Sequence, residues 1–79
     1  MSNQHEILAR VRELVAEALE TPLDQITPQL EFGGIQAWDS MGHMSIMMLL
    51  EEKFGVEIDA EKIAALTSIP AICAYVSKE

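Results

Sequence analysis

The chain has 79 residues and a formal net charge of -8, from five basic and thirteen acidic side chains. A chain of this length buries only roughly two-thirds of its unfolded surface, which leaves room for one modest core and no deep reaction chamber. We therefore expect a single domain over residues 1–79, and not a self-sufficient enzyme. The 49% hydrophobic content with only 5% aromatic residues indicates an ordered core of aliphatic residues and methionine.

The acidity restricts the class of partner. A negative surface repels nucleic-acid phosphates and anionic lipids, so we expect protein partners with basic patches and neither nucleic acid nor membrane. The single cysteine, Cys73, can form neither an internal disulfide nor a cysteine cluster for a metal. The first residues have neither the basic start nor the apolar stretch of a signal peptide. These observations predict a cytoplasmic monomer without a bound metal.

The first predicted element is a helix over about residues 3–19. Apolar residues recur at helical spacing from Ile7 to Leu19. Asn3 and Glu6 have the spacing of a capping box at its start, with Asn in place of Ser or Thr.

A long connection follows and reaches Trp38. Prolines at 22 and 28 and the Gly33-Gly34 pair interrupt regular structure along it. An irregular segment of this length is uncommon in a small domain, and it either carries function or packs over the core. Its apolar residues favour a packed loop: Leu23, Ile26, Leu30, Phe32 and Ile35.

A second long helix is predicted to begin at Asp39-Ser40 and to end at Gly55, with a cap at each end. Asp59 is a good N-cap for a short third helix through about Ala65, with Ile58 and Ile63 at the spacing of a hydrophobic staple.

The last helix is predicted to start at Ser68 and tolerates Pro70 in its first turn. The fold class is therefore all-α: a small bundle of three main helices plus one short helix, with a long loop between the first two.

The second helix has two apolar stripes. At roughly 100° per residue, counting from Ser40, a core stripe falls at about 240° to 340° and a methionine stripe at about 40° to 100°. The core stripe contains Ile46, Met47, Leu50 and Phe54, and the methionine stripe contains Met41, Met44 and Met48, with Glu51 and Glu52 beside it. The methionine stripe either is an exposed surface suited to several partners or is covered by the long loop.

Ser40 lies where free backbone N–H groups and the helix dipole favour an attached anion such as a phosphate ester. Asp39 and Ser40 are equally ordinary helix caps, so this pair alone does not decide between a cap and an attachment site.

The whole pattern resembles the acyl carrier proteins. The residues that carry the resemblance are Trp38-Asp39-Ser40-Met41-Gly42-His43-Met44, Leu49 to Ile58, Leu66-Thr67-Ser68-Ile69 and Ile72 to Val76. The likeness extends over the full chain, including the first helix, the long loop, the size and the acidity.

The resemblance implies that Ser40 receives a covalent 4'-phosphopantetheine arm from coenzyme A, through a phosphopantetheinyl transferase and its magnesium ion. The arm's thiol would carry an acyl group as a thioester, and the chain itself would have no catalytic residue. Asp39 and Met41 would lie next to the arm. The partner enzymes would be ones that transfer, condense or adenylate acyl groups. The surface that docks them would consist of Met41, Met44, Met48, Glu51 and Glu52.

The resemblance also implies a small cavity in the core that takes up some acyl chain. The residues around it would be Ile7, Val11, Leu14, Ile46, Leu50, Phe54, Ile58, Ile63, Ile69 and Ile72.

The chain departs from the family pattern in two features. The carriers of primary fatty acid synthesis have acidic residues two and five positions after the serine, where this chain has Gly42 and Ser45. The usual Gly-x-Asp-Ser pattern begins here with Ala37, and bulky Trp38 occupies its second position. Asp-Ser-Met-Gly is similar to the D-alanyl carriers of teichoic acid modification, and Trp-Asp-Ser before Gly-His-Met is similar to stand-alone carriers of specialised pathways. The resemblance therefore implies an acyl cargo, from a fatty acid, polyketide or specialised pathway, or alternatively an aminoacyl cargo.

Two other functions are compatible with parts of the pattern. One is an unmodified helical interaction module that uses only the methionine stripe. The other is a small hydrolase using Ser40 and His43, which lacks an orienting acid. For His43 we favour packing against the loop, for Trp38 a loop anchor, and for Cys73 an inert thiol on an apolar face.

Overall fold

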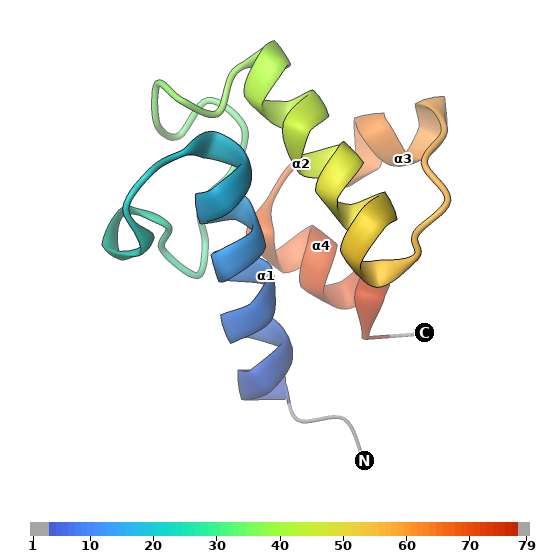
Figure 1. Cartoon of the computed structure of the whole chain (residues 1–79), viewed down its shortest axis with the longest axis horizontal. Coiled ribbons are helices and arrows are strands. Elements are labelled where there is room, and N and C mark those ends of the chain that lie inside the picture. The colour runs from blue at the N-terminus through green and yellow to red at the C-terminus, as the bar shows by residue number, and fades with distance from the viewer. Residues whose placement is uncertain (1–3, 78–79) are drawn as a thin grey trace.

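The computed structural model describes residues 4–77, and within them it contains four α-helices and one short 3-10 turn (Figure 1). The helices are α1 (Gln4–Leu19), α2 (Ser40–Phe54), α3 (Ala60–Ala65) and α4 (Ile69–Val76), and the 3-10 turn is η1 (Leu23–Gln25). The described chain has no β-strand, only an isolated bridge between Glu31 and Ser68. The predicted all-α bundle with one short helix is confirmed.

Four of the predicted helix boundaries have the cap that the sequence indicates. The Asp39 side chain accepts a hydrogen bond from the Gly42 N–H at 2.9 Å, and Asp59 accepts one from the Lys62 N–H at 2.9 Å. Gly55 ends α2 in the left-handed conformation, with φ of 70°. The α4 cap is Ser68, whose hydroxyl accepts from the Ala71 N–H at 3.1 Å. The capping residue predicted at Asn3 lies outside the described residues.

The core lies where α1 packs on both α2 and α4, while α3 packs on α2 (Figure 1). The predicted core stripe of α2 is correct for Ile46, Met47 and Leu50, which are fully buried. Four residues predicted in the core lie at its margin, where they are only partly buried, because they sit at helix ends or on the short α3 and its approach. They are Ile7, Phe54, Ile58 and Ile63.

The long connection packs over the bundle as predicted, although two of its apolar residues remain largely exposed. Ile26, Leu30 and Trp38 are buried, whereas Leu23 and Phe32 are 42% and 44% exposed. Leu23 begins the one-turn η1, which lies outside the core. Phe32 follows the Glu31–Ser68 bridge, where its N–H donates to the Thr67 carbonyl at 2.8 Å.

Arg12 of α1 holds the first part of the connection. Its Nε donates to the carbonyl of Ile26, and its terminal nitrogen donates to the carbonyl of Leu23 at 3.2 Å. The guanidinium group therefore satisfies two carbonyls of a segment that has little regular structure. This role was not predicted from the sequence.

Gly42 allows the end of the connection to lie against α2. A Cβ atom at this position would overlap the carbonyl oxygen of Ala37 and would meet Cδ2 of Leu19 at 2.7 Å. A side chain here would therefore displace backbone. This close approach gives a physical reason for the absence of an acidic residue two positions after Ser40.

Replacing Gly42 with Ala is expected to lower the free energy of unfolding by about 1–3 kcal/mol, because the methyl group overlaps the Ala37 carbonyl. Without the overlap, Ala would stabilise a helix interior by about 1 kcal/mol relative to Gly. The sign of the change in the free energy of unfolding therefore shows whether the overlap exists. Urea unfolding followed by circular dichroism measures the change. Ser45→Ala, one turn further along α2, is the control and should have little effect, and an unchanged or raised midpoint for Gly42→Ala would contradict the packing described.

Candidate functional site

Ser40 is the first residue of α2 and is exposed. The preceding Asp39 uses its carboxylate to cap the helix through the Gly42 N–H, which fixes the backbone at this point. The Ser40 hydroxyl itself makes no hydrogen bond to any other described residue. An exposed, uncommitted hydroxyl at a helix N-terminus is suited to carrying a phosphate ester, because the helix dipole favours a negative charge there.

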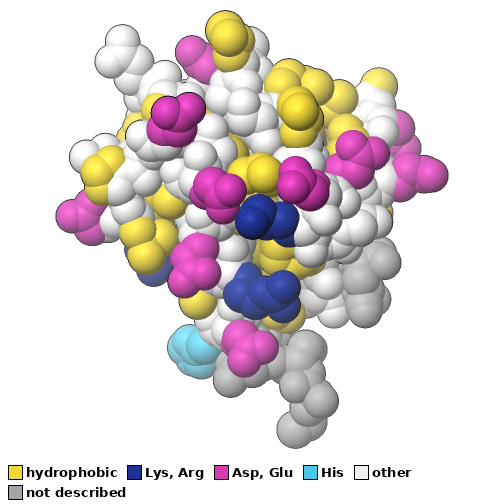
Figure 2. Space-filling view, in the orientation of Figure 1, with side chains coloured by type: hydrophobic (Ala, Val, Ile, Leu, Met, Phe, Trp, Pro, Cys, Tyr) yellow, Lys and Arg dark blue, Asp and Glu magenta, His cyan; other side chains and the backbone are white. Residues whose placement is uncertain are grey.

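The methionine stripe of α2 is exposed, which decides between the two alternatives left by the sequence. The exposed fractions are 82% for Met41, 43% for Met44 and 65% for Met48. Glu51 and Glu52 are exposed on the same helix. Figure 2 shows hydrophobic side chains at the surface over the start of α2 and acidic side chains further along.

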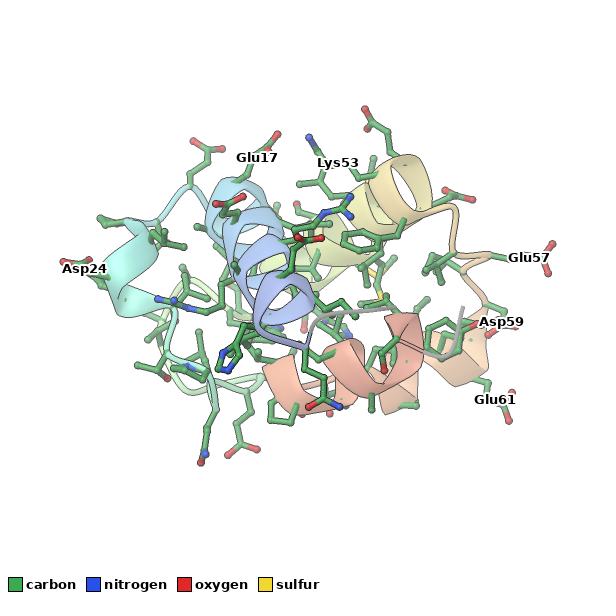
Figure 3. All side chains as sticks on the ribbon, turned by 90° about the horizontal axis from the view of Figure 1, so that it is seen from below. Glu17, Asp24, Lys53, Glu57, Asp59 and Glu61 are labelled. Atoms are coloured by element: carbon green, nitrogen blue, oxygen red, sulfur yellow. The ribbon has the colours of Figure 1, made fainter. Side chains whose placement is uncertain are left out.

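Every basic side chain in residues 4–77 is engaged away from Ser40. Arg10 lies over the Phe54 ring, 5.1 Å from its centroid. Lys53 pairs with Glu17 at 3.4 Å, and Figure 3 shows these two side chains next to each other. Arg12 holds the long connection. Over the described residues, the start of α2 therefore has no positive charge beside its exposed methionines.

Lys62, the fourth of these basic residues, pairs with Asp59 at 3.2 Å and lies 5.8 Å from the centroid of the Tyr75 ring. The hydrogen bond from the Lys62 backbone N–H lowers the pKa of Asp59, and the hydrogen bond to Asp59 raises the pKa of Lys62. This pair secures the start of α3.

A buried hydrogen-bonded chain joins the loop, α2 and α3 behind Ser40. The indole N–H of Trp38 donates to Nδ1 of His43 at 3.0 Å, and Nε2 of His43 lies 2.8 Å from the Ile63 carbonyl oxygen. Because indole can only donate, Nδ1 is the acceptor and Nε2 carries the proton, so the ring is the neutral Nε2–H tautomer. Both predictions, packing of His43 against the loop and Trp38 as an anchor, are confirmed.

The hydrogen bonds of His43 also argue against the hydrolase alternative. A general base for Ser40 needs a ring nitrogen free to accept its proton. Both nitrogens of His43 are engaged, one by Trp38 and the other by the Ile63 carbonyl. The geometry therefore does not support a Ser-His pair.

A surface cleft of about 320 Å³ opens beside Ser40, between α2 and α3. Phe32 forms part of its wall, with its ring edge-on to His43 at 5.6 Å between centroids. The complete lining is Phe32, Ser40, His43, Met44, Ile63 and Thr67. The contribution of Phe32 to the cleft was not predicted, because it depends on the backbone hydrogen bond from Phe32 to Thr67, which only the three-dimensional structure reveals.

A larger hollow of about 390 Å³ lies between the N-terminal part of α1 and α4, and its lining includes Cys73 but not Ser40. Burial raises the pKa of the Cys73 thiol, which agrees with an inert thiol. In residues 4–77, His, Cys, Asp and Glu nowhere gather into a metal-binding group. None of the described helices has the length and apolar character required to cross a membrane.

Comparison with known proteins identifies the family. Residues 9–76 match the family described as "Phosphopantetheine attachment site". The acyl carrier protein of Thermosynechococcus vestitus is 31% identical over 77 residues, which cover 98% of this chain and 95% of that protein. Acyl carrier protein 3 of Ralstonia nicotianae is 30% identical over 70 residues, covering 89% and 80% respectively. The meromycolate extension acyl carrier protein of Mycobacterium tuberculosis is 32% identical over 75 residues, covering 95% of this chain and 65% of that protein.

The chain therefore belongs to the acyl carrier protein family, whose members are non-catalytic carriers with a 4'-phosphopantetheine cofactor. This membership confirms the family resemblance of the sequence and favours a carrier over an unmodified interaction module.

Replacing Trp38 with Phe is expected to lower the free energy of unfolding by about 1–3 kcal/mol, because a fully buried ring loses volume and Nδ1 of His43 loses its donor. Urea unfolding followed by circular dichroism measures the loss. Phe32→Leu, which changes an exposed ring on the other side of His43, is the comparison and should cost less. Equal losses would contradict the anchoring role of the buried indole and its hydrogen bond.

Proposed function

We propose that this member of the acyl carrier protein family carries its 4'-phosphopantetheine arm on Ser40 and delivers acyl groups to partner enzymes. The observation that carries the proposal is the exposed, uncommitted Ser40 hydroxyl at the N-terminus of α2, inside the matched segment 9–76. The attachment forms a bond from the Ser40 oxygen to phosphorus, the hydroxyl loses its proton, and the nucleotide part of coenzyme A leaves. A separate transferase with magnesium performs this step.

The residues around Ser40 fit such a group. The N-terminal end of α2 favours the negative charge of a phosphodiester, and the cleft next to it leaves room for a chain to lie against the protein. Asp39 holds the backbone of Ser40 in place through its cap, and its exposed carboxylate is available to help position the magnesium ion during transfer. When attached, the arm supplies a terminal thiol that holds the acyl group as a thioester.

The geometry explains why a carrier of this size needs no active site. A tether at an exposed helix start presents its cargo at high effective concentration to each docked enzyme. The pathway is one of fatty acid, polyketide or specialised acyl transfer. An aminoacyl cargo is the second candidate, favoured by the similarity of Asp39-Ser40-Met41-Gly42 to the D-alanyl carriers.

The docking surface for partner enzymes consists of Met41, Met44, Met48, Glu51 and Glu52. Its support is the exposure of the methionines together with the absence of basic residues near Ser40 in the described chain. Flexible methionines adapt to several partners, and the carboxylates attract a basic surface from a distance. The expected partners are the phosphopantetheinyl transferase and enzymes that transfer, condense or adenylate acyl groups.

The first test is intact-mass spectrometry of the purified chain before and after incubation with coenzyme A, magnesium and a broad-specificity phosphopantetheinyl transferase. We expect one added phosphopantetheine mass on the wild type and none on Ser40→Ala. Ser45→Ala, which changes another serine on the same helix, should be modified like the wild type. If the folded wild type gained no mass, or if Ser40→Ala gained it, the proposed attachment site would be wrong.

The docking surface is tested with the same transferase, by measuring kcat/KM for modification of the variants. Met44→Ala should lower kcat/KM by about five- to tenfold at any salt concentration. The double variant Glu51→Gln, Glu52→Gln should lower it mainly at low salt, because solution ions screen exposed charges.

The matched control is Glu57→Gln, a change at an exposed carboxylate that Figure 3 shows pointing outward from the chain after α2. It should leave kcat/KM close to that of the wild type. If Glu57→Gln lowered kcat/KM as much as the double variant, a general charge effect would account for the result, and docking would not be localised on α2.

A further inference from the structure

The imidazole of His43 fastens α2 to α3 immediately beside Ser40. Its Nε2–H donates to the Ile63 carbonyl at 2.8 Å, and its Nδ1 accepts from the Trp38 indole at 3.0 Å. The ring is 5% exposed, and Trp38 behind it is fully buried. We call the contact between α2 and α3 beside Ser40 the seam. Its inner end is closed by the His43 ring, whose two nitrogens are both hydrogen-bonded.

We propose, on the basis of the attachment at Ser40, that His43 determines cargo specificity by closing this seam. The cargo then lies in the surface cleft and does not enter the core. The substrate class that fits is a short acyl group with a hydrogen-bonding substituent, such as a hydroxyacyl or aminoacyl group. A long unbranched alkyl chain does not fit.

Opening the seam is unfavourable for two physical reasons. A long alkyl chain passing between α2 and α3 would separate His43 from Ile63 and leave a buried N–H and a carbonyl facing hydrocarbon without partners. Beyond the seam the chain would meet fully buried side chains, among them Ile46 and Met47, that are already packed together. The proposed cargo site is therefore the cleft at the surface and not the core cavity that the family resemblance implies.

The cleft itself is mixed in character. Phe32, Met44 and Ile63 provide apolar walls that suit a few carbon atoms. Thr67 adds a partly exposed hydroxyl that makes no hydrogen bond to the described residues, at the side of the cleft formed by the connection from α3 to α4. A substituent that donates or accepts a hydrogen bond would find a partner there, whereas an alkyl chain would leave the hydroxyl unpaired.

The experiment loads the apo protein from butyryl-, 3-hydroxybutyryl-, octanoyl- and dodecanoyl-coenzyme A with the transferase, and intact mass confirms each product. Failure of loading would contradict the attachment at Ser40, whereas the proposal on His43 is tested only on loaded protein. For the wild type we expect the Tm of the octanoyl and dodecanoyl forms to stay within about 1 °C of the butyryl form. Amide chemical-shift changes should be confined to the cleft residues.

Variants of His43 provide the second arm. His43→Val removes both hydrogen bonds, so the Tm should rise with chain length and chemical-shift changes should reach the buried Ile46 and Ile72. His43→Gln retains one donor and one acceptor and should behave like the wild type. If His43→Val does not fold, the Tm values and chemical shifts of the loaded wild-type forms test the proposal by themselves.

The polar substituent is tested by comparing the butyryl and 3-hydroxybutyryl forms. The hydroxyl should add a chemical-shift change at Thr67 that is lost in Thr67→Val, a variant of nearly the same shape. The proposal would be overturned by a wild-type Tm that rises with chain length, by shift changes in the buried core of the wild type, by a folded His43→Val that matches the wild type, or by the absence of a hydroxyl effect at Thr67.

Discussion

The buried hydrogen bond between Trp38 and His43 fixes the position of Ser40. Trp38 is the last apolar residue of the long connection, and its indole hydrogen bond to His43 fastens the loop to the first turn of α2. The same imidazole reaches the Ile63 carbonyl on α3. One ring therefore links the loop, α2 and α3, and Ser40 lies between the two hydrogen-bonded residues in the sequence. Under the proposed attachment, these contacts fix the point of α2 from which the arm extends.

The rest of the connection is held by contacts that do not depend on regular structure. Arg12 engages two of its carbonyls, the Glu31–Ser68 bridge ties its middle to the start of α4, and Gly42 lets its end touch α2. These contacts use side-chain donors and backbone proximity in place of a sheet or helix. They place Phe32 at the rim of the cleft, so the loop contributes to the site as well as covering the core.

The helices could be predicted from the sequence because their signals are local. Capping residues such as Asp39 and Asp59, the glycine at 55 and the apolar spacing of α2 each act within a few positions. Helical spacing also separated the buried stripe from the exposed methionines. Whether the methionines were covered depended on the path of the loop, which spacing does not contain.

The loop contacts could not be predicted, because they join residues that are far apart in the sequence. Arg12 and Ile26 are fourteen positions apart, and His43 and Ile63 are twenty positions apart. Both pairs involve a backbone carbonyl, which has no signature in the sequence. The departure at Gly42 was visible, but its cause, the Ala37 carbonyl occupying the space that a methyl group would need, exists only in three dimensions.

The charge distribution and the packing lead to the same division of labour. The described basic side chains are used within the fold, to hold the loop, to cover Phe54 and to pair with Glu17 and Asp59. The exposed face of α2 is left with methionines and, toward the end of the helix, with Glu51 and Glu52. Under the proposed docking, this surface attracts basic enzymes and adapts to more than one of them. If the seam beside Ser40 is closed by the hydrogen-bonded His43, as proposed, the cargo stays at the same surface that is proposed to dock the enzymes. Under the proposed attachment, docking and delivery then require no rearrangement of the bundle. The cargo is recognised only by the few residues that line the cleft beside Ser40.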